Sequence, residues 1–222
     1  MGRETAMLKG KYLSILGDSV STYNGVSNDG SANAALYANR VYYFSRHFPV
    51  ESTYWHIILR EYGMRLCVNN SFSGGELSGK DNPFSGVSRS RHLSRDSGES
   101  PDVIIVFMGL NDLGRGVDAE IFRSDYEATL STIARDHPLA RVFCVNMPNR
   151  PNFLTERTKI INSVIEGAVE AAGDNFFLVR LYDHVFKDYD EFYMNTVDGL
   201  HPDPDGMKII AEAIRTAIDK SL

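Results

Sequence analysis

The sequence is poor in cysteine, with only Cys67 and Cys144 among its 222 residues. Two cysteines without CxxC spacing do not make a metal site, and none is expected. Each cysteine lies inside an apolar run, at 66–68 and 143–145. We therefore expect two buried free thiols on neighbouring strands.

The sequence also lacks an excess of basic residues. Lysine and arginine number 23 against 29 aspartates and glutamates, which gives a net charge of −6. Nucleic-acid binding requires a basic surface that neutralises phosphates, so nucleic acid is not an expected partner. The one basic cluster, from Arg89 to Arg95, is short and interrupted, and it indicates a solvated helix face.

Long apolar runs are missing as well. No stretch of the sequence approaches the length of a membrane span, so no membrane partner is expected. Residues 1–11 carry charges but no apolar core before the first predicted strand, which is not the pattern of a signal peptide. If this start is native, we expect a cytoplasmic protein.

What the sequence does contain is the pattern of one α/β domain, which we place at residues 1–222. Five short apolar runs predict buried strands. The runs are continuous and not alternating, as parallel strands covered on both faces require. The predicted strands are Tyr12–Leu16, Arg65–Val68, Val103–Met108, Val142–Val145 and Phe176–Leu181.

Helical patterns separate most of these strands, and a further one follows the last. The alternation predicts a parallel sheet with right-handed crossovers, in which ligands bind beyond the carboxyl ends of the strands. Two long loops, 20–51 and 75–101, are expected to be functional or mobile. The apolar stripes are Trp55, Ile58, Leu59 and Tyr62; Phe122, Tyr126, Leu130 and Ile133; Ile161, Val164, Ile165, Ala168, Val169 and Ala172, with Thr155 as N-cap; and Met207, Ile210, Ala211, Ile214 and Ile218.

Polar segments lie where these strands end. Gly17-Asp18-Ser19 follows the first strand, a segment ending in Gly74 follows the second, and Gly109-Leu110-Asn111-Asp112 follows the third. Asp198 and His201 lie just before the last predicted helix. We expect all four segments to meet at the carboxyl edge of the sheet, with the Ser19 hydroxyl and the His201 ring within hydrogen-bond reach.

These residue types are the ones that acyl transfer needs. A serine hydrolase requires a nucleophile, a base that takes its proton and an acid that orients the base, and Ser19, His201 and Asp198 can supply them. It also requires donors aimed at the developing oxyanion. The backbone N–H groups of Ser19 and Gly74 and the side-chain amide of Asn111 can supply these donors.

Each of these signals has a simpler explanation when it is taken alone. Gly-Asp-Ser is also good turn chemistry. Asn111 and Asp112 can close a turn, and His201 can be a surface histidine. Asp203 and Pro204 predict the N-cap and the first turn of the last helix, where short-range bonding is common. These explanations do not account for the coincidence of four such segments, all expected at the same edge of the sheet.

The four segments, in this order, resemble the sequence blocks of the GDSL/SGNH hydrolases. Ser19 matches the serine of the first block, Gly74 the glycine of the second and Asn111 the asparagine of the third. Asp198 and His201 match the Asp-x-x-His pair of the last block.

This resemblance spans residues 13–214. It implies a flavodoxin-like three-layer α/β/α sandwich with a five-stranded parallel sheet, and it implies a serine esterase that needs neither a metal nor an organic cofactor. One departure is Val20, where the family name has leucine.

The expectations about substrate depend on the loop that follows the proposed nucleophile. It is rich in aromatic residues, of which we expect about half to anchor the loop and the rest to line a cleft. We expect Asp18, Tyr42 and Phe44 to contact a small-molecule acyl ester. A short acyl chain is favoured, with an acetylated saccharide as one candidate. The family resemblance leaves a lysophospholipase or a thioesterase open, and a non-catalytic flavodoxin-like binding module is the alternative outside catalysis. The aromatic residues are Tyr23, Tyr37, Tyr42, Tyr43, Phe44, Phe48 and Tyr54.

Overall fold

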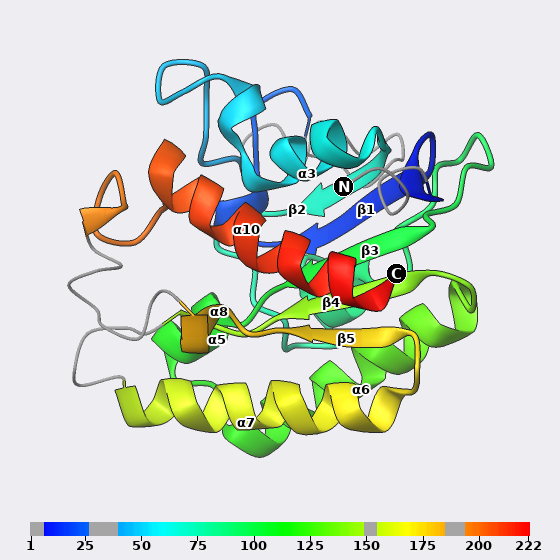
Figure 1. Cartoon of the computed structure of the whole chain (residues 1–222). Helices are drawn as coiled ribbons and strands as arrows, with labels where there is room; N and C mark the ends of the chain where they lie inside the picture. The colour runs from blue at the N-terminus through cyan, green and yellow to red at the C-terminus, as the bar shows by residue number, and fades with distance from the viewer. Residues whose placement is uncertain (1–6, 27–39, 149–154, 185–193) are drawn as a thin grey trace.

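Five parallel strands form one sheet in the order β2-β1-β3-β4-β5 (Figure 1). The computed structural model describes residues 7–26, 40–148, 155–184 and 194–222. The strands are β1 (Tyr12–Gly17), β2 (Arg65–Ser71), β3 (Val103–Phe107), β4 (Arg141–Val145) and β5 (Phe176–Val179). The α-helices are α3 (Tyr54–Tyr62), α4 (Gly86–Arg89), α5 (Leu110–Arg115), α6 (Ala119–Asp136), α7 (Thr155–Ala172), α8 (Leu181–His184) and α10 (Pro204–Ser221), and two 3-10 turns are η1 (Ser19–Ser21) and η2 (Val50–Ser52).

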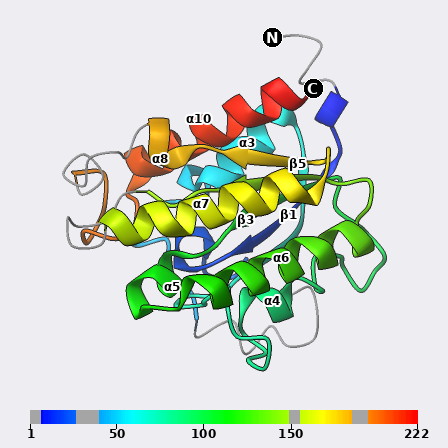
Figure 2. The same cartoon turned by 90° about the horizontal axis from the view of Figure 1, so that it is seen from below.

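Helices cover both faces of this sheet, which makes the fold a three-layer α/β/α sandwich. Helices α3 and α10 lie together on one face, and α4, α6 and α7 lie on the other (Figures 1 and 2). The predicted apolar stripes of α3, α6, α7 and α10 form the inner surfaces of these layers. Every residue of β3, the central strand, is buried, because helices cover it on both sides. The predicted fold class is therefore confirmed.

Strand order and register decide where the polar segments meet. The order β2-β1-β3-β4-β5 reverses direction between β1 and β3, and such switch points are where ligands bind in open α/β sheets. At that point Gly17 is paired with Ser71 of β2 on one side and with Phe107 of β3 on the other. The chain therefore leaves three neighbouring strands at the same height.

Strand β2 is longer than the apolar pattern predicted. It continues through three polar residues to Ser71, and all three are buried. Their polar groups are satisfied inside the protein, as burial requires. The Asn69 amide donates to the carbonyl of Ser21 at 3.0 Å, and the Ser71 hydroxyl donates to Asn69 at 2.6 Å. Hydrogen bonding thus replaces apolar character as the reason for burial at this end of the strand.

Two expectations about single residues were wrong. Cys67 and Cys144 are buried and free, but they lie on β2 and β4, which β1 and β3 separate. Arg89 does not belong to a solvated face, because it is 1% exposed. Its guanidinium donates to the carbonyls of Gly17 (3.0 Å), Asn70 and Phe84 (2.9 Å). A single buried cation therefore ties the ends of β1 and β2 to the crossover between β2 and β3.

Boundaries differ by smaller amounts elsewhere. Thr155 is already helical in α7 and is therefore not its cap. The predicted cap of α10 is confirmed: the Asp203 carboxylate accepts the N–H groups of Asp205 and Gly206, and Pro204 follows it. Within the described ranges, no helix combines the length and apolar character of a membrane span.

The contact around Gly17 generates a test of stability. A Cβ atom at this position would lie 2.5 Å from the Ser21 hydroxyl and 2.7 Å from that of Ser71. We expect Gly17→Ala to lower the free energy of unfolding by about 1–3 kcal/mol, the usual cost of overpacking, and denaturant titration measures it. Gly167→Ala is the matched control, because it adds a methyl group on α7 with nothing within 4 Å. Gly167→Ala should stabilise by up to about 1 kcal/mol, and equal stabilities would contradict the tight packing at Gly17.

Candidate active site

Ser19 lies two residues after the end of β1 and is the first residue of the 3-10 turn η1. The turn starts here because the Asp18 carboxylate accepts the N–H of Val20 at 3.0 Å and so caps it. Asp18 is 1% exposed, which leaves it no surface to offer a substrate. The expectation that Asp18 contacts substrate is therefore replaced by a structural role beside the nucleophile.

Asp198 and His201 lie in the loop before α10, which local hydrogen bonds shape. One carboxylate oxygen of Asp198 accepts the N–H groups of Leu200 (3.0 Å) and His201 (2.8 Å). The other oxygen contacts Nδ1 of His201 at 2.9 Å. The spacing of three residues lets a single carboxylate cap the turn and orient the imidazole.

The structure brings Ser19 and His201 together although 182 residues separate them. The Ser19 hydroxyl lies 2.9 Å from Nε2 of His201, within the reach that proton transfer requires. When Nδ1–H donates to Asp198, Nε2 is left to accept the proton of Ser19. A chain of contacts thus joins the Ser19 hydroxyl, the His201 ring and the Asp198 carboxylate at the carboxyl edge of the sheet.

The charge of Asp198 is stabilised by the groups around it. Burial acts to raise the pKa of this carboxyl, but hydrogen bonds from Tyr42 and from the backbone and ring of His201 lower its pKa well below the ordinary value. The carboxylate is therefore ionised at neutral pH. It can hold the imidazole in one orientation and favour its positive charge.

Three candidate oxyanion donors lie on the segments that follow β1, β2 and β3 at the carboxyl edge of the sheet. The N–H groups of Ser19 and Gly74 donate to no residue that the structure describes. Gly74 has a φ of 77°, which turns the chain sharply after β2. The Asn111 amide donates to the Gly75 carbonyl at 2.9 Å and lies 3.4 Å from the Asp18 carboxylate. Asn111 therefore lies between the segments that carry the other two donors.

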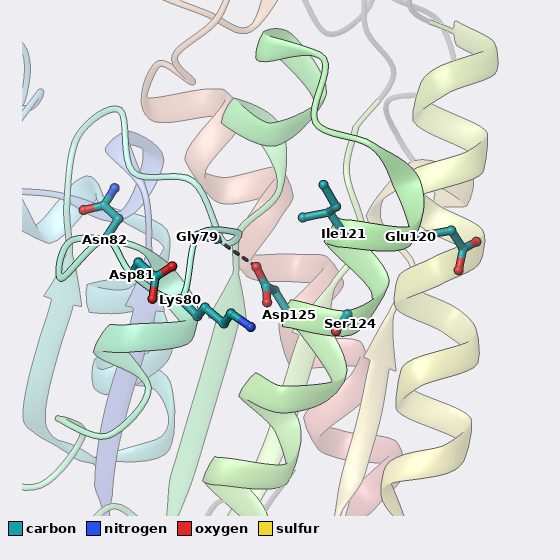
Figure 3. A pocket seen from close by; sticks show the side chains of 8 residues that line it. All are labelled: Gly79, Lys80, Asp81, Asn82, Glu120, Ile121, Ser124 and Asp125. Atoms are coloured by element: carbon teal, nitrogen blue, oxygen red, sulfur yellow. Dashed lines mark hydrogen bonds between the residues drawn. The ribbon is translucent and has the colours of Figure 1, made fainter.

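Two carboxylates that the sequence patterns did not single out hold the loop that carries Gly74. Asp112, fully buried, accepts the N–H groups of Leu77 (2.8 Å) and Ser78 (2.9 Å). Asp125 of α6 accepts the N–H of Gly79 at 2.8 Å (Figure 3). From the sequence, Asp112 is explained as a residue that closes a turn. Its position next to Asn111 is the only feature of the sequence that could have indicated its structural role.

The aromatic residues after the nucleophile separate into distinct groups. Tyr43, Phe48 and Tyr54 are buried and anchor the loop, as expected for part of the set. Tyr42 lies against the triad: its ring stacks on that of His201 with centroids 3.5 Å apart, and its hydroxyl donates to Asp198 at 2.6 Å. Tyr37 lies outside the described residues.

Phe44, the other expected substrate contact, lies elsewhere. Its ring is covered by the guanidinium of Arg46 at 4.7 Å and is close to the ring of His47. Among the described side chains it makes no ring contact with a triad residue. The structure therefore gives Phe44 no contact that supports a role at the nucleophile.

A large cavity of about 800 Å³ lies away from the triad, between residues 79–82 and the first turns of α6 (Figure 3). It opens beside the hydrogen bond from Gly79 to Asp125. No triad or oxyanion residue lines it. Its lining residues are Gly79, Lys80, Asp81, Asn82, Glu120, Ile121, Ser124 and Asp125.

The chain matches a family model over most of its length. The model of the GDSL-like lipase/acylhydrolase family matches residues 15–209, a span that includes Ser19, Gly74, Asn111, Asp198 and His201. The chain belongs to the GDSL-like lipase/acylhydrolase family. It is therefore a hydrolase of ester bonds, and the alternative of a non-catalytic binding module is set aside. Comparison with curated proteins gave no match.

Solved structures of this GDSL hydrolase's relatives share its fold. One described as a GDSL-like lipase, from Bacteroides ovatus ATCC 8483, is 22% identical with a TM-score of 0.73, covering 96% of this chain and 99% of that one. The esterase EstA from Pseudoalteromonas sp. is 18% identical with a TM-score of 0.62 over 95% and 97%. A variant of an acetyl xylan esterase from Geobacillus stearothermophilus is 20% identical with a TM-score of 0.61 over 95% of each chain.

The role of Asp112 in holding the Gly74 loop is testable. In Asp112→Asn the new amide places N–H groups against a backbone N–H, so one of the two bonds is lost in a buried position. We expect a loss of about 1–3 kcal/mol in the free energy of unfolding. We also expect a lower kcat on a p-nitrophenyl ester, because the loop that carries an oxyanion donor loosens. Asp81→Asn, on the same loop but exposed, should change neither quantity, and identical behaviour of the two variants would contradict the role of Asp112.

Proposed function

We propose that this hydrolase cleaves a short-chain carboxylic ester with Ser19 as nucleophile, His201 as base and Asp198 as the orienting acid. The observation that carries the proposal is the chain of contacts from the Ser19 hydroxyl to Nε2 of His201 and from Nδ1 to Asp198, each 2.9 Å long. Both distances suit direct proton transfer and orientation without an intervening group.

In the first half of the reaction, Nε2 of His201 takes the proton of Ser19 while the serine oxygen attacks the ester carbonyl. The resulting imidazolium gives that proton to the leaving alcohol, and an acyl-enzyme remains. In the second half, His201 deprotonates a water that attacks the acyl carbonyl, and the proton returns to Ser19 as the acid leaves. Asp198 stays ionised throughout, in keeping with its lowered pKa.

The oxyanion of each tetrahedral intermediate is held by Ser19 N–H, Gly74 N–H and the Asn111 amide. The first two donors have no described acceptor to compete for them. One N–H of Asn111 is engaged by the Gly75 carbonyl, whereas the 3.4 Å contact with Asp18 is long for a hydrogen bond. The second N–H of Asn111 therefore has little to lose on turning to the substrate.

The acyl group is small in this proposal. The segment after the nucleophile carries bulky rings toward the site, and Tyr42 already covers one side of the catalytic pair. An acetylated saccharide is the substrate candidate we favour, and one of the structural relatives is an acetyl xylan esterase. Long-chain lipid or thioester substrates are the competing possibility within the family.

Two substitutions separate the nucleophile from an oxyanion donor. Ser19→Ala should abolish both turnover and covalent labelling by an organophosphonate, because the attacking oxygen is gone. Asn111→Ala should still be labelled, but its kcat should fall by about 10²–10³, the usual cost of one lost oxyanion donor. Mass spectrometry and initial rates measure these effects. An Asn111→Ala enzyme with an altered KM alone would show that Asn111 binds substrate and does not stabilise the oxyanion.

A series of p-nitrophenyl esters of graded length tests the acyl group. We expect higher kcat/KM for acetyl and butyryl esters than for decanoyl or longer esters. The effect should be modest, because one methylene group that fits poorly costs only about 1–3 kcal/mol of transition-state binding. Rising kcat/KM out to long chains would overturn the short-acyl proposal and favour a lipase. Equal values at all lengths would place the specificity on the alcohol, and acetylated sugars then become the decisive substrates.

A further inference from the structure

We infer that Tyr42 is a positioning residue of the catalytic pair, acting on His201 by stacking and on Asp198 by a hydrogen bond. The inference rests on the proposed function, and it gives Tyr42 a different task from contacting substrate. Two separate contacts carry it. The rings of Tyr42 and His201 lie nearly parallel, at an angle of 13° and a centroid distance of 3.5 Å. The Tyr42 hydroxyl lies 2.6 Å from the same Asp198 oxygen that faces Nδ1 of His201.

These contacts complete the environment of Asp198. The side chain of Asp198 is 40% exposed, which is a high value for the acid of a triad that must stay fixed. One of its oxygens takes two backbone N–H groups, from Leu200 and His201. The other takes the imidazole and the hydroxyl of Tyr42. Four hydrogen bonds thus fix a carboxylate that burial alone does not immobilise.

Tyr42 can do this because its own backbone is tied to the nucleophile. Its N–H donates to the hydroxyl oxygen of Thr22 at 2.8 Å, and that hydroxyl donates to the carbonyl of Ser19 at 2.8 Å. The neighbouring Tyr43 is fixed on the other side, since its hydroxyl donates to the Pro202 carbonyl at 2.8 Å. Residues 42 and 43 therefore bridge the two loops that carry Ser19 and His201.

The two contacts affect the charge on His201 in opposite directions. The face of the Tyr42 ring stabilises the imidazolium that forms in each half-reaction, by a cation–π interaction. The hydroxyl donates to Asp198 and weakens the pull of that carboxylate on the imidazolium. Burial together with the bond to Asp198 and its charge raises the pKa of Tyr42, so the hydroxyl remains a donor at neutral pH. A substitution that removes one contact should therefore change the pKa of His201 differently from a substitution that removes both.

Other titratable groups lie near this stack. His47 lies parallel to Tyr42 at 5.5 Å, and Tyr43 meets the His201 ring edge-on at 6.3 Å. Asp18 and Asp203 act on the neighbouring Tyr43 through their charges. His47 is the other imidazole in this group. A His47→Asn variant therefore leaves His201 as the only imidazole of the stack whose NMR signals are followed.

The experiment compares Tyr42→Phe, which keeps the stack, with Tyr42→Leu, which loses both contacts. The matched control is Tyr23→Phe, which removes a hydroxyl that donates to the Phe48 carbonyl in the same region. The readouts are kcat and KM on p-nitrophenyl acetate, the rate of organophosphonate labelling, and the imidazole pKa of His201 followed by NMR in the His47→Asn background. The NMR titration does not depend on turnover.

We expect Tyr42→Phe to keep kcat within about fivefold of the parent and to raise the pKa of His201 by about half a unit, since Asp198 then attracts the imidazolium more strongly. Tyr42→Leu should lower kcat and the labelling rate by about 10²-fold with KM changed less than about threefold, as for a misplaced catalytic group. Its His201 pKa should lie about half a unit or more below that of Tyr42→Phe. Tyr23→Phe should leave all of these quantities unchanged.

Two results for Tyr42→Leu would overturn the positioning role. Wild-type kcat, labelling rate and His201 pKa in Tyr42→Leu would overturn the positioning role. A rise in KM with kcat and His201 pKa unchanged would also overturn it and would make Tyr42 a substrate contact. Failure of the proposed function looks different, because the parent protein would then neither turn over esters nor take up the phosphonate.

Discussion

The parallel register of β2, β1 and β3 is the constraint on which the site depends. Gly17 is paired with both Ser71 and Phe107, so three strands end at one level on the side where the sheet reverses its order. Ser19, Gly74 and Asn111 follow these three ends. A shift of one residue in either pairing would move a donor or the nucleophile by more than 3 Å, which exceeds what proton transfer or oxyanion binding tolerates.

Buried polar contacts, and not apolar packing alone, hold that register. Arg89 joins the carbonyls of Gly17 and Asn70, and Asn69 reaches back to the turn that carries Ser19. Asp112 fixes the loop after Gly74 from within the helix that presents Asn111. Such groups are costly to bury unless they are satisfied, so they favour one arrangement of the loops over many similar ones. The proposed oxyanion donors are therefore held by side chains that have no part in the proposed chemistry.

The proposed triad is assembled from two hydrogen-bonded segments. One is the capped turn at the end of β1, and the other is the loop before α10, whose shape depends on Asp198. The segment at Tyr42 and Tyr43 joins them, through Thr22 on one side and Pro202 on the other. Because a third segment fixes both of them, substrate binding has a smaller entropic cost of ordering the catalytic groups to overcome. It also limits solvent at a carboxylate that the fold leaves partly open.

Local sequence patterns were sufficient to predict the fold class and to nominate the members of the proposed triad. Apolar runs and stripes are local signals. The rule that parallel strands end at a shared edge is then enough to predict that a serine, a glycine and an asparagine at strand ends lie close together. Four features became evident only in the folded chain: the burial of Arg89, the separation of the cysteines by two strands, the role of Asp18 as a cap and the placement of Tyr42 on His201. These features depend on strand order and on contacts between residues far apart in the chain. Local periodicity carries no information on such contacts, so an arginine beside serines has the pattern of a surface residue until the carbonyls that surround it are known.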